Sequence, residues 1–169
     1  MELTWKEGLT AAGGRTDPSE VLSCLYDEYG TDVLRLCFMY MKNRPDAEDA
    51  AQETFLKVWL RLDSFESRNH SSIKTWIMRV ARNTCLDFLR KRTRRERAAA
   101  MEDPGWPGSV SREDRELMMD VLDLPEKYRG AVLMIYWQSM TLREAAKALG
   151  TSPSAVCRRL KKALSMLEG

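Results

Sequence analysis

The chain has 169 residues, of which 44% are hydrophobic and 31% charged, and its formal net charge is +2. This balance is too apolar for a disordered chain and too charged for a membrane protein, and no run approaches the roughly 18 apolar residues of a transmembrane helix. The four cysteines lie far apart and His70 is the single histidine, so we expect no disulfide framework, metal site or other cofactor. The first residues lack the basic-then-apolar order of a signal peptide, and we therefore expect a soluble, cytoplasmic protein.

The small net charge hides four blocks of opposite sign. Residues 26–66 hold five Lys/Arg against nine Asp/Glu (net −4), and residues 98–128 hold three against eight (net −5). Residues 79–97 hold eight Lys/Arg against two Asp/Glu (net +6), and residues 141–169 hold six against two (net +4). The two basic blocks are either solvated helix faces or binding sites for a polyanion, and their placement on the predicted helices decides between these interpretations.

After a flexible tail over residues 1–16, Asp17 and Pro18 are typical of a helix start. An apolar-rich helix follows to about Lys42, with a break near Gly30 left open. Asn43-Arg44-Pro45 ends this helix, because the residue before a proline is pushed out of the helical region. The next helix is expected to be capped by Asp46, to run to about Asp63, and to bury Ala50, Phe55, Val58, Trp59 and Leu62.

A third helix is predicted from about Ile73 to Arg92. Its apolar residues recur at spacings of three and four, which marks one buried stripe made of Ile73, Trp76, Ile77, Val80 and Ala81. The opposite face carries Thr75, Arg79, Arg82, Asn83 and Arg90. The first basic block is therefore a surface stripe on an ordered helix.

Residues 96–110 are predicted to be a flexible linker, because residues 104–108 hold two prolines and two glycines. The linker separates an N-terminal domain, residues 17–95, from a C-terminal domain, residues 111–169. The second domain opens with helices from Ser111 to about Leu122 and from Pro125 to about Trp137. No segment shows the alternation of a strand, so we predict an all-α protein of two small helical domains.

The last two helices are predicted to form a helix-turn-helix. Thr141 and Glu144 make a capping box, Gly150 suits the helix end, and Ser152-Pro153 opens the final helix. The pair is expected to bury Leu142, Ala145, Ala146, Leu149, Val156, Leu160, Ala163, Leu164 and Leu167. The outer face of the final helix carries Ser154, Ala155, Arg158, Arg159 and Lys162. A small, basic face at this position favours contact with base edges in a major groove over an αα-hairpin that merely faces water.

At this point the chain from about residue 25 onward resembles the extracytoplasmic-function (ECF) group of bacterial RNA polymerase sigma factors. Three motifs carry the resemblance in the order of that family: residues 46–59, residues 73–90, and residues 124–129 followed by the helix-turn-helix. The resemblance implies that the first motif grips the β′ clamp of polymerase, that the second opens and binds the −10 promoter strand, and that the third binds the −35 element.

The first motif supplies an acidic surface near a helix start, formed by Asp46, Glu48, Asp49, Gln52 and Glu53. Such a surface can pair with basic groups of a protein partner and would repel nucleic acid. Complementation of the helix dipole explains part of Glu48 and Asp49, but it explains Gln52 and Glu53, one turn further on, less well.

In the second motif, Arg79, Arg82 and Arg90 are expected to contact phosphates. The polar loop of His70, Ser71 and Ser72, beside Lys74, resembles the family loop that holds a flipped base. Trp76 is either a wall of that pocket or, as its place on the apolar stripe favours, part of the core. Asn83 fits the family pattern and equally fits a structural hydrogen bond.

The third motif departs from the family at Cys157 and Arg158, where a basic residue and a serine are usual. This leaves open which −35 sequence is preferred and which of Arg158 and Arg159 touches a base. The candidate −35 contacts are Arg143, Ser154, Ala155, Arg158, Arg159 and Lys162.

The predicted function is that of an alternative sigma factor without catalytic activity. Its implied partners are core RNA polymerase (the β′ clamp and β), promoter DNA and an anti-sigma factor, with no small-molecule substrate and no direct membrane insertion. A stand-alone helix-turn-helix repressor is the alternative, but it would leave the acidic motif and the first basic helix without a purpose. An enzyme acting on nucleic acid is disfavoured, because the sequence offers no carboxylate cluster, phosphate-binding glycine loop or nucleophile–base pair.

Overall fold

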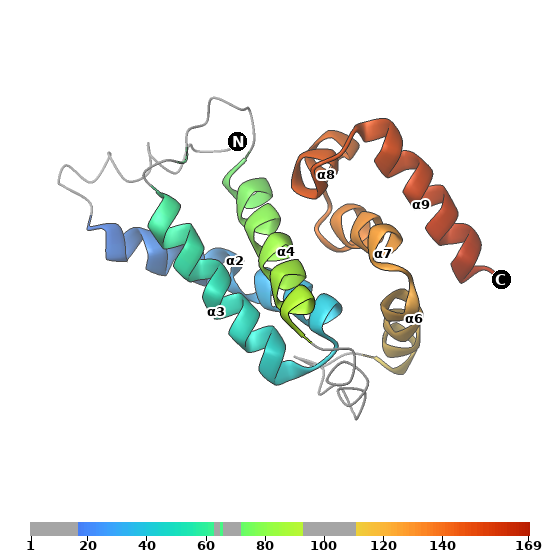
Figure 1. Cartoon of the computed structure of the whole chain (residues 1–169), viewed down its shortest axis with the longest axis horizontal. Helices are drawn as coiled ribbons and strands as arrows, with labels where there is room; N and C mark the ends of the chain where they lie inside the picture. Colours follow the sequence, from blue (N-terminus) through green and yellow to red (C-terminus); the bar gives the residue numbers. More distant parts are fainter. Residues whose placement is uncertain (1–16, 63–64, 66–71, 93–110) are drawn as a thin grey trace.

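The computed structural model describes residues 17–62, 65, 72–92 and 111–169, and every regular element in this part of the chain is helical (Figure 1). The elements are α2 (Pro18–Met41), α3 (Arg44–Arg61), α4 (Ile73–Lys91), α6 (Arg112–Asp123), α7 (Glu126–Val132), the π-helix η3 (Leu133–Trp137), α8 (Leu142–Leu149) and α9 (Pro153–Leu167). The predicted tail and linker lie outside the described residues.

Helices α2, α3 and α4 pack pairwise into an N-terminal bundle. The predicted start at Asp17 is confirmed, since its carboxylate accepts a hydrogen bond from the Ser19 backbone N–H at 3.0 Å. The break considered near Gly30 is absent, because α2 continues to Met41. The prediction that Asp46 caps α3 is wrong: the Asn43 side chain accepts from the Asp46 backbone N–H, and α3 begins at Arg44.

The last six residues of α2 are covered on all sides. All six residues from Leu36 to Met41 are buried, although a helix packed on one face buries only about every third or fourth residue. Helices α3 and α4 cover part of this segment. The C-terminal domain covers more of it, since the Arg129 side chain donates a hydrogen bond to the Met39 carbonyl at 2.9 Å.

The helix-turn-helix forms as predicted from its capping residues. The Thr141 hydroxyl and the Glu144 carboxylate make both hydrogen bonds of a capping box on α8. Gly150 ends α8 with φ +64°, and the Ser152 side chain caps α9. Two of the residues expected to be buried are exposed, because Leu142 and Leu164 lie toward the outer sides of α8 and α9, at 40% and 37% exposure.

The two domains pack against each other. Helix α8 contacts α4, and buried residues of both domains belong to one continuous hydrophobic core. The sequence left the relative position of the two domains open, and in the structure they are in direct contact. Two continuous apolar runs, residues 36–41 and 131–134, are buried along their whole length. Both runs belong to the core that the two domains share.

Candidate nucleic-acid interface

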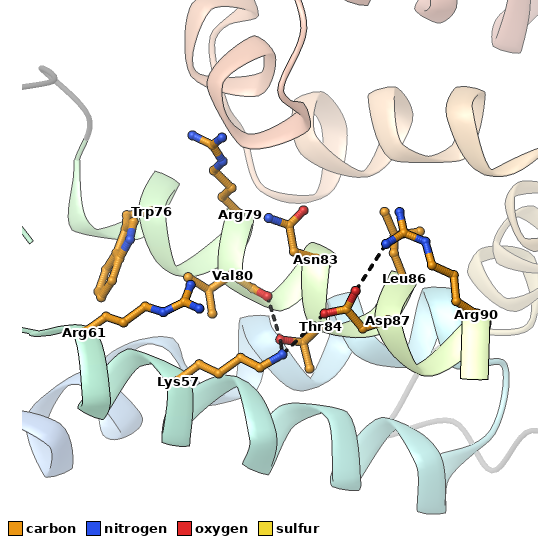
Figure 2. Close-up of a pocket in the computed structure, with 10 residues that line it drawn as sticks. All are labelled: Lys57, Arg61, Trp76, Arg79, Val80, Asn83, Thr84, Leu86, Asp87 and Arg90. Atoms are coloured by element: carbon orange, nitrogen blue, oxygen red, sulfur yellow. Dashed lines mark hydrogen bonds and ion pairs between the residues drawn. The ribbon is translucent and has the colours of Figure 1, made fainter. Parts of the chain in front are cut away.

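A groove of about 510 Å³ lies between α3 and α4 (Figure 2). This volume is within the roughly 300–1,000 Å³ of ligand sites in proteins. Its lining residues are Lys57, Arg61, Trp76, Arg79, Val80, Asn83, Thr84, Leu86, Asp87 and Arg90. Four of these side chains are basic and one is acidic, so the groove suits an anionic ligand.

The basic side chains come from both helices. Figure 2 shows Lys57 reaching from α3 to α4, where its ammonium donates to the Thr84 hydroxyl at 3.3 Å and lies 3.6 Å from the Asp87 carboxylate. Arg61 extends from the next turn of α3 toward Val80 in α4. Lys57 and Arg61 were not among the predicted site residues. Their spacing of four, which places both on one face of α3, was the available signal.

Trp76 is half-buried and forms one end of the groove. Its ring packs against Phe65 with centroids 4.9 Å apart. The core and wall interpretations of Trp76 are therefore compatible, since one part of the ring packs inward while another lines the groove. Thr75 was expected on the outer face, but it is 2% exposed and its backbone N–H and hydroxyl both meet the Ser72 hydroxyl.

The predicted polar site residues of α4 fall into two sets. Arg79, Asn83 and Arg90 are exposed, and in Figure 2 Arg79 and Asn83 point away from α3. Lys74 and Arg82 are half-buried and contact the C-terminal domain. His70 and Ser71 lie outside the described residues, whereas Ser72 caps α4.

The candidate −35 residues lie together on the outer side of the helix-turn-helix. Arg143, Ser154, Arg158 and Lys162 are exposed, and Ala155 and Arg159 are half-exposed. Helix α9 is held from beneath by Val156 and Ala163, which are fully buried. The first turn of α9 is therefore presented to solvent on a well-packed support (Figure 1).

Two of the acidic residues of α3 form ion pairs within the protein. The Asp46 carboxylate pairs with the Arg92 guanidinium at the end of α4, and Glu48 pairs with Arg44 at 2.8 Å. Asp49 and Gln52 are exposed. Asp46 therefore joins two helices of the bundle. Its role differs in this way from that of the more exposed side chains further along α3.

Two exposed leucines extend the acidic surface. Leu56 and Leu60 are 51% and 72% exposed, and their spacing from Asp49 and Glu53 places all four on one stripe of α3. We call these residues, together with Gln52, the α3 ridge. Neither leucine was among the predicted site residues, although both lie opposite the buried residues of this helix and were open to prediction.

Two family models match the chain over most of its length. Sigma-70 region 2 matches residues 25–95, and Sigma-70, region 4 matches residues 115–167. RNA polymerase sigma factor SigV of Bacillus subtilis (strain 168) is 30% identical over 159 residues, which cover 90% of this chain and 92% of SigV. ECF RNA polymerase sigma factor SigX of the same strain is 30% identical over 164 residues, covering 88% of this chain and 82% of SigX. The chain belongs to the ECF group of RNA polymerase sigma factors.

Two solved structures share the fold of this sigma factor. CnrH in complex with the cytosolic domain of CnrY matches with a TM-score of 0.67 at 22% identity, covering 95% of this chain and 91% of CnrH. Sigma factor RpoE, in complex with the anti-sigma factor NepR from Bartonella quintana, matches with a TM-score of 0.70 at 22% identity, covering 86% and 93%. These matches and the family models confirm the predicted all-α architecture of two small domains.

The described part of the sigma factor holds no cluster of three or more histidine, cysteine, aspartate or glutamate side chains that would bind a metal ion. None of its described helices is both long enough and apolar enough to span a membrane.

Proposed function

We propose that the groove between α3 and α4 binds the −10 promoter strand during transcription initiation. The observation that carries this assignment is the joint presence of four cations and one aromatic wall in a single groove. Cations track the phosphates of a single strand, while an aromatic ring stacks on an unpaired base. His70, Ser71, Ser72 and Lys74 border the same end of α4 in sequence, and we assign them to the base pocket of this site.

The α3 ridge is proposed to dock on the clamp of core polymerase. The exposed Asp49 carboxylate and the half-buried Glu53 carboxylate, which lies 4.0 Å from the Lys57 ammonium, offer charge complementarity to a basic partner, and Leu60 offers exposed apolar surface. Glu48 lies beside the ridge and takes part in the same contact. Asp46 supports it indirectly, because its pair with Arg92 holds α3 against α4.

The first turn of α9 is proposed to enter the major groove of the −35 element. Ser154 and Ala155 are small enough for close approach, and Arg158 and Arg159 follow one turn later. Arg143 and Lys162 flank this turn and are assigned to phosphate. The protein acts with polymerase in the cytoplasm, and an anti-sigma factor, the partner named in the RpoE complex, is its proposed negative regulator.

Transcription in vitro with purified core polymerase and a promoter library tests these assignments. Initiation at sites that pair a −35 with a −10 element is expected. The Glu53→Lys variant should lose polymerase binding, whereas duplex binding by its C-terminal domain should persist. Tight binding of a palindrome by the protein alone, without initiation, would instead support the repressor alternative.

A further inference from the structure

Among the described residues that line the groove between α3 and α4, Asp87 is the one acid. Its carboxylate contacts two groove cations, since it lies 3.6 Å from the Lys57 ammonium and 3.3 Å from the Arg90 guanidinium. Lys57 comes from α3 and Arg90 from α4 (Figure 2). A carboxylate repels the phosphates of a strand. In a groove that binds DNA, this charge is therefore expected to have a specific role.

The Lys57 ammonium is held against α4 by Thr84 as well as by Asp87. Thr84 is fully buried, and its hydroxyl donates to the Val80 carbonyl at 2.8 Å. Because this bond uses the single hydroxyl hydrogen, the Thr84 oxygen acts toward Lys57 as an acceptor, at 3.3 Å. The hydroxyl and the carboxylate of α4 together fix the ammonium inside the groove.

Lys57 also has a carboxylate partner outside the groove. Glu53 lies one turn earlier on α3, and its carboxylate is 4.0 Å from the same ammonium. Glu53 belongs to the α3 ridge and does not line the groove. A lysine side chain is a flexible stem with a compact charge, so the position of its ammonium depends on the balance between the two carboxylates. The shorter distance to Asp87 and the bond to Thr84 favour the groove.

We propose that Asp87 is a positioning residue, which holds the Lys57 ammonium in the groove so that it meets a phosphate of the bound strand. The proposal rests on the proposed function of this groove as the −10 site. An ammonium has three N–H donors, and Thr84 and Asp87 occupy two of them, which leaves one for the strand. Fixing the lysine before the strand arrives reduces the conformational entropy that is lost on binding.

Asp87 has a weaker hold on Arg90 than on Lys57. The Arg90 side chain is 76% exposed, against 25% for Lys57, and exposed ion pairs contribute little. A further cation of α4, Arg82, lies outside the groove and pairs with Glu126 at 3.4 Å instead. Removal of the Asp87 carboxylate should therefore affect strand binding mainly through Lys57.

The Asp87→Asn variant distinguishes positioning from simple charge. If charge alone counted, removal of a carboxylate from the groove would strengthen binding of a strand. We expect binding to be about fivefold weaker instead, the loss of one hydrogen bond to the strand, because Lys57 moves toward Glu53. The slope of log K against log salt should become shallower by about 0.7, the value of one phosphate contact on a single strand.

A photo-cross-link to Trp76 measures occupancy of this groove in the intact protein. Trp76 lines the groove, and a strand of about 12 nucleotides that carries 5-bromodeoxyuridine should cross-link to its ring when a base stacks there. Mass spectrometry gives the yield of the Trp76 peptide against strand concentration, and hence the affinity at each salt concentration. Urea denaturation measures any loss of the contact between α3 and α4, which would not by itself change the salt slope.

Double variants assign the effect to Lys57. The effect of Asp87→Asn should disappear in a Lys57→Ala background and persist in an Arg90→Ala background. Glu53→Gln should increase affinity more in the Asp87→Asn protein than in the wild type, because it removes the competing carboxylate. Asp120→Asn is the matched control, since Asp120 is an exposed acid of α6, and it should leave the cross-link yield unchanged.

The outcomes separate this proposal from the proposed function. Stronger binding by Asp87→Asn, or an equal loss with and without Lys57, would overturn the positioning role while the groove remains the −10 site. If Lys57→Ala alone leaves the cross-link yield unchanged, the groove assignment is refuted and the positioning role with it.

Discussion

Leu60 is the most exposed large apolar side chain of the described residues, at 72% exposure. A leucine in this position contributes little to folding, and its spacing places it on the stripe of α3 that also carries Glu53. The side chain therefore has an energetic role only if a partner covers it. Leu62, two residues further along the chain, is buried and contributes to the core instead.

We predict that Leu60→Ser weakens binding to core polymerase by about tenfold, or about 1.4 kcal/mol. Because the side chain is exposed, the free energy of unfolding should change by less than about 0.5 kcal/mol. Fluorescence anisotropy with labelled protein measures the first quantity, and urea denaturation measures the second. Unchanged affinity would place Leu60 outside the interface.

Arg158 and Arg159 differ in exposure, since Arg158 is exposed and Arg159 is half-exposed. We predict that alanine at whichever residue forms a bidentate contact with a base costs about 1–3 kcal/mol on the preferred −35 sequence and relaxes specificity at one base pair. Alanine at the other should weaken all sequences about equally. Binding of each variant to a panel of single-substitution −35 duplexes distinguishes the two roles, and identical profiles would assign both to phosphate.

At the scale of the element, the turn between α8 and α9 depends on backbone conformation at one residue. Gly150 has φ +64°, and a Cβ built there would meet no atom within 4 Å. Any cost of a side chain at this position therefore comes from the left-handed backbone and not from packing. This makes the turn a clean place to measure conformational strain.

We predict that Gly150→Ala lowers the free energy of unfolding by about 1 kcal/mol, since a left-handed residue with a Cβ costs roughly 1–2 kcal/mol and alanine recovers part of this through the unfolded chain. Gly150→Asn should cost less, because asparagine tolerates this conformation. Urea denaturation with an unchanged m-value is the measurement. Equal losses for both variants would point to a contact of the turn that involves the side chain.

Local chemistry explains why the helix-turn-helix was predictable from sequence and part of α3 was not. The capping box at Thr141 and the glycine at 150 act within a few residues, so their pattern in the chain is their pattern in space. The start of α3 was assigned to Asp46 because both Asn43 and Asp46 are good caps, and only the structure shows which accepts the hydrogen bond. The groove cations of α3 required knowledge of how α3 faces α4.

At the scale of the whole molecule, the packing of the domains is a long-range property that residue spacing does not encode. The unbroken apolar run of residues 36–41 exceeds what one face of a helix needs, and this was the available signal for a second covering surface. The predicted linker left the arrangement of the domains open, and hydrophobic burial between α4 and α8 favours their contact. Charged blocks that are separated along the sequence are therefore brought close together by the packing of the domains.

We predict that packing of the domains changes the salt dependence of DNA binding. Release of Arg82 in Glu126→Ala should make the slope of log K against log salt for nonspecific duplex DNA steeper by about 0.9, the value of one added phosphate contact. Asp120→Ala removes the same charge without releasing a cation, and should leave the slope at the wild-type value. Filter binding between 50 and 200 mM salt, as in ordinary practice for such slopes, is the measurement.

The π-helix η3 has a consequence for comparing this chain with its relatives. Its ladder joins the Gln138 backbone N–H to the Leu133 carbonyl, five residues back, so this turn accommodates one residue more than an α-helical turn. A relative with a regular α-helix here would be one residue shorter before the Thr141 cap. An alignment gap placed anywhere after that cap would rotate the assigned side chains of α9 by about 100° and pair base-contacting positions with buried ones.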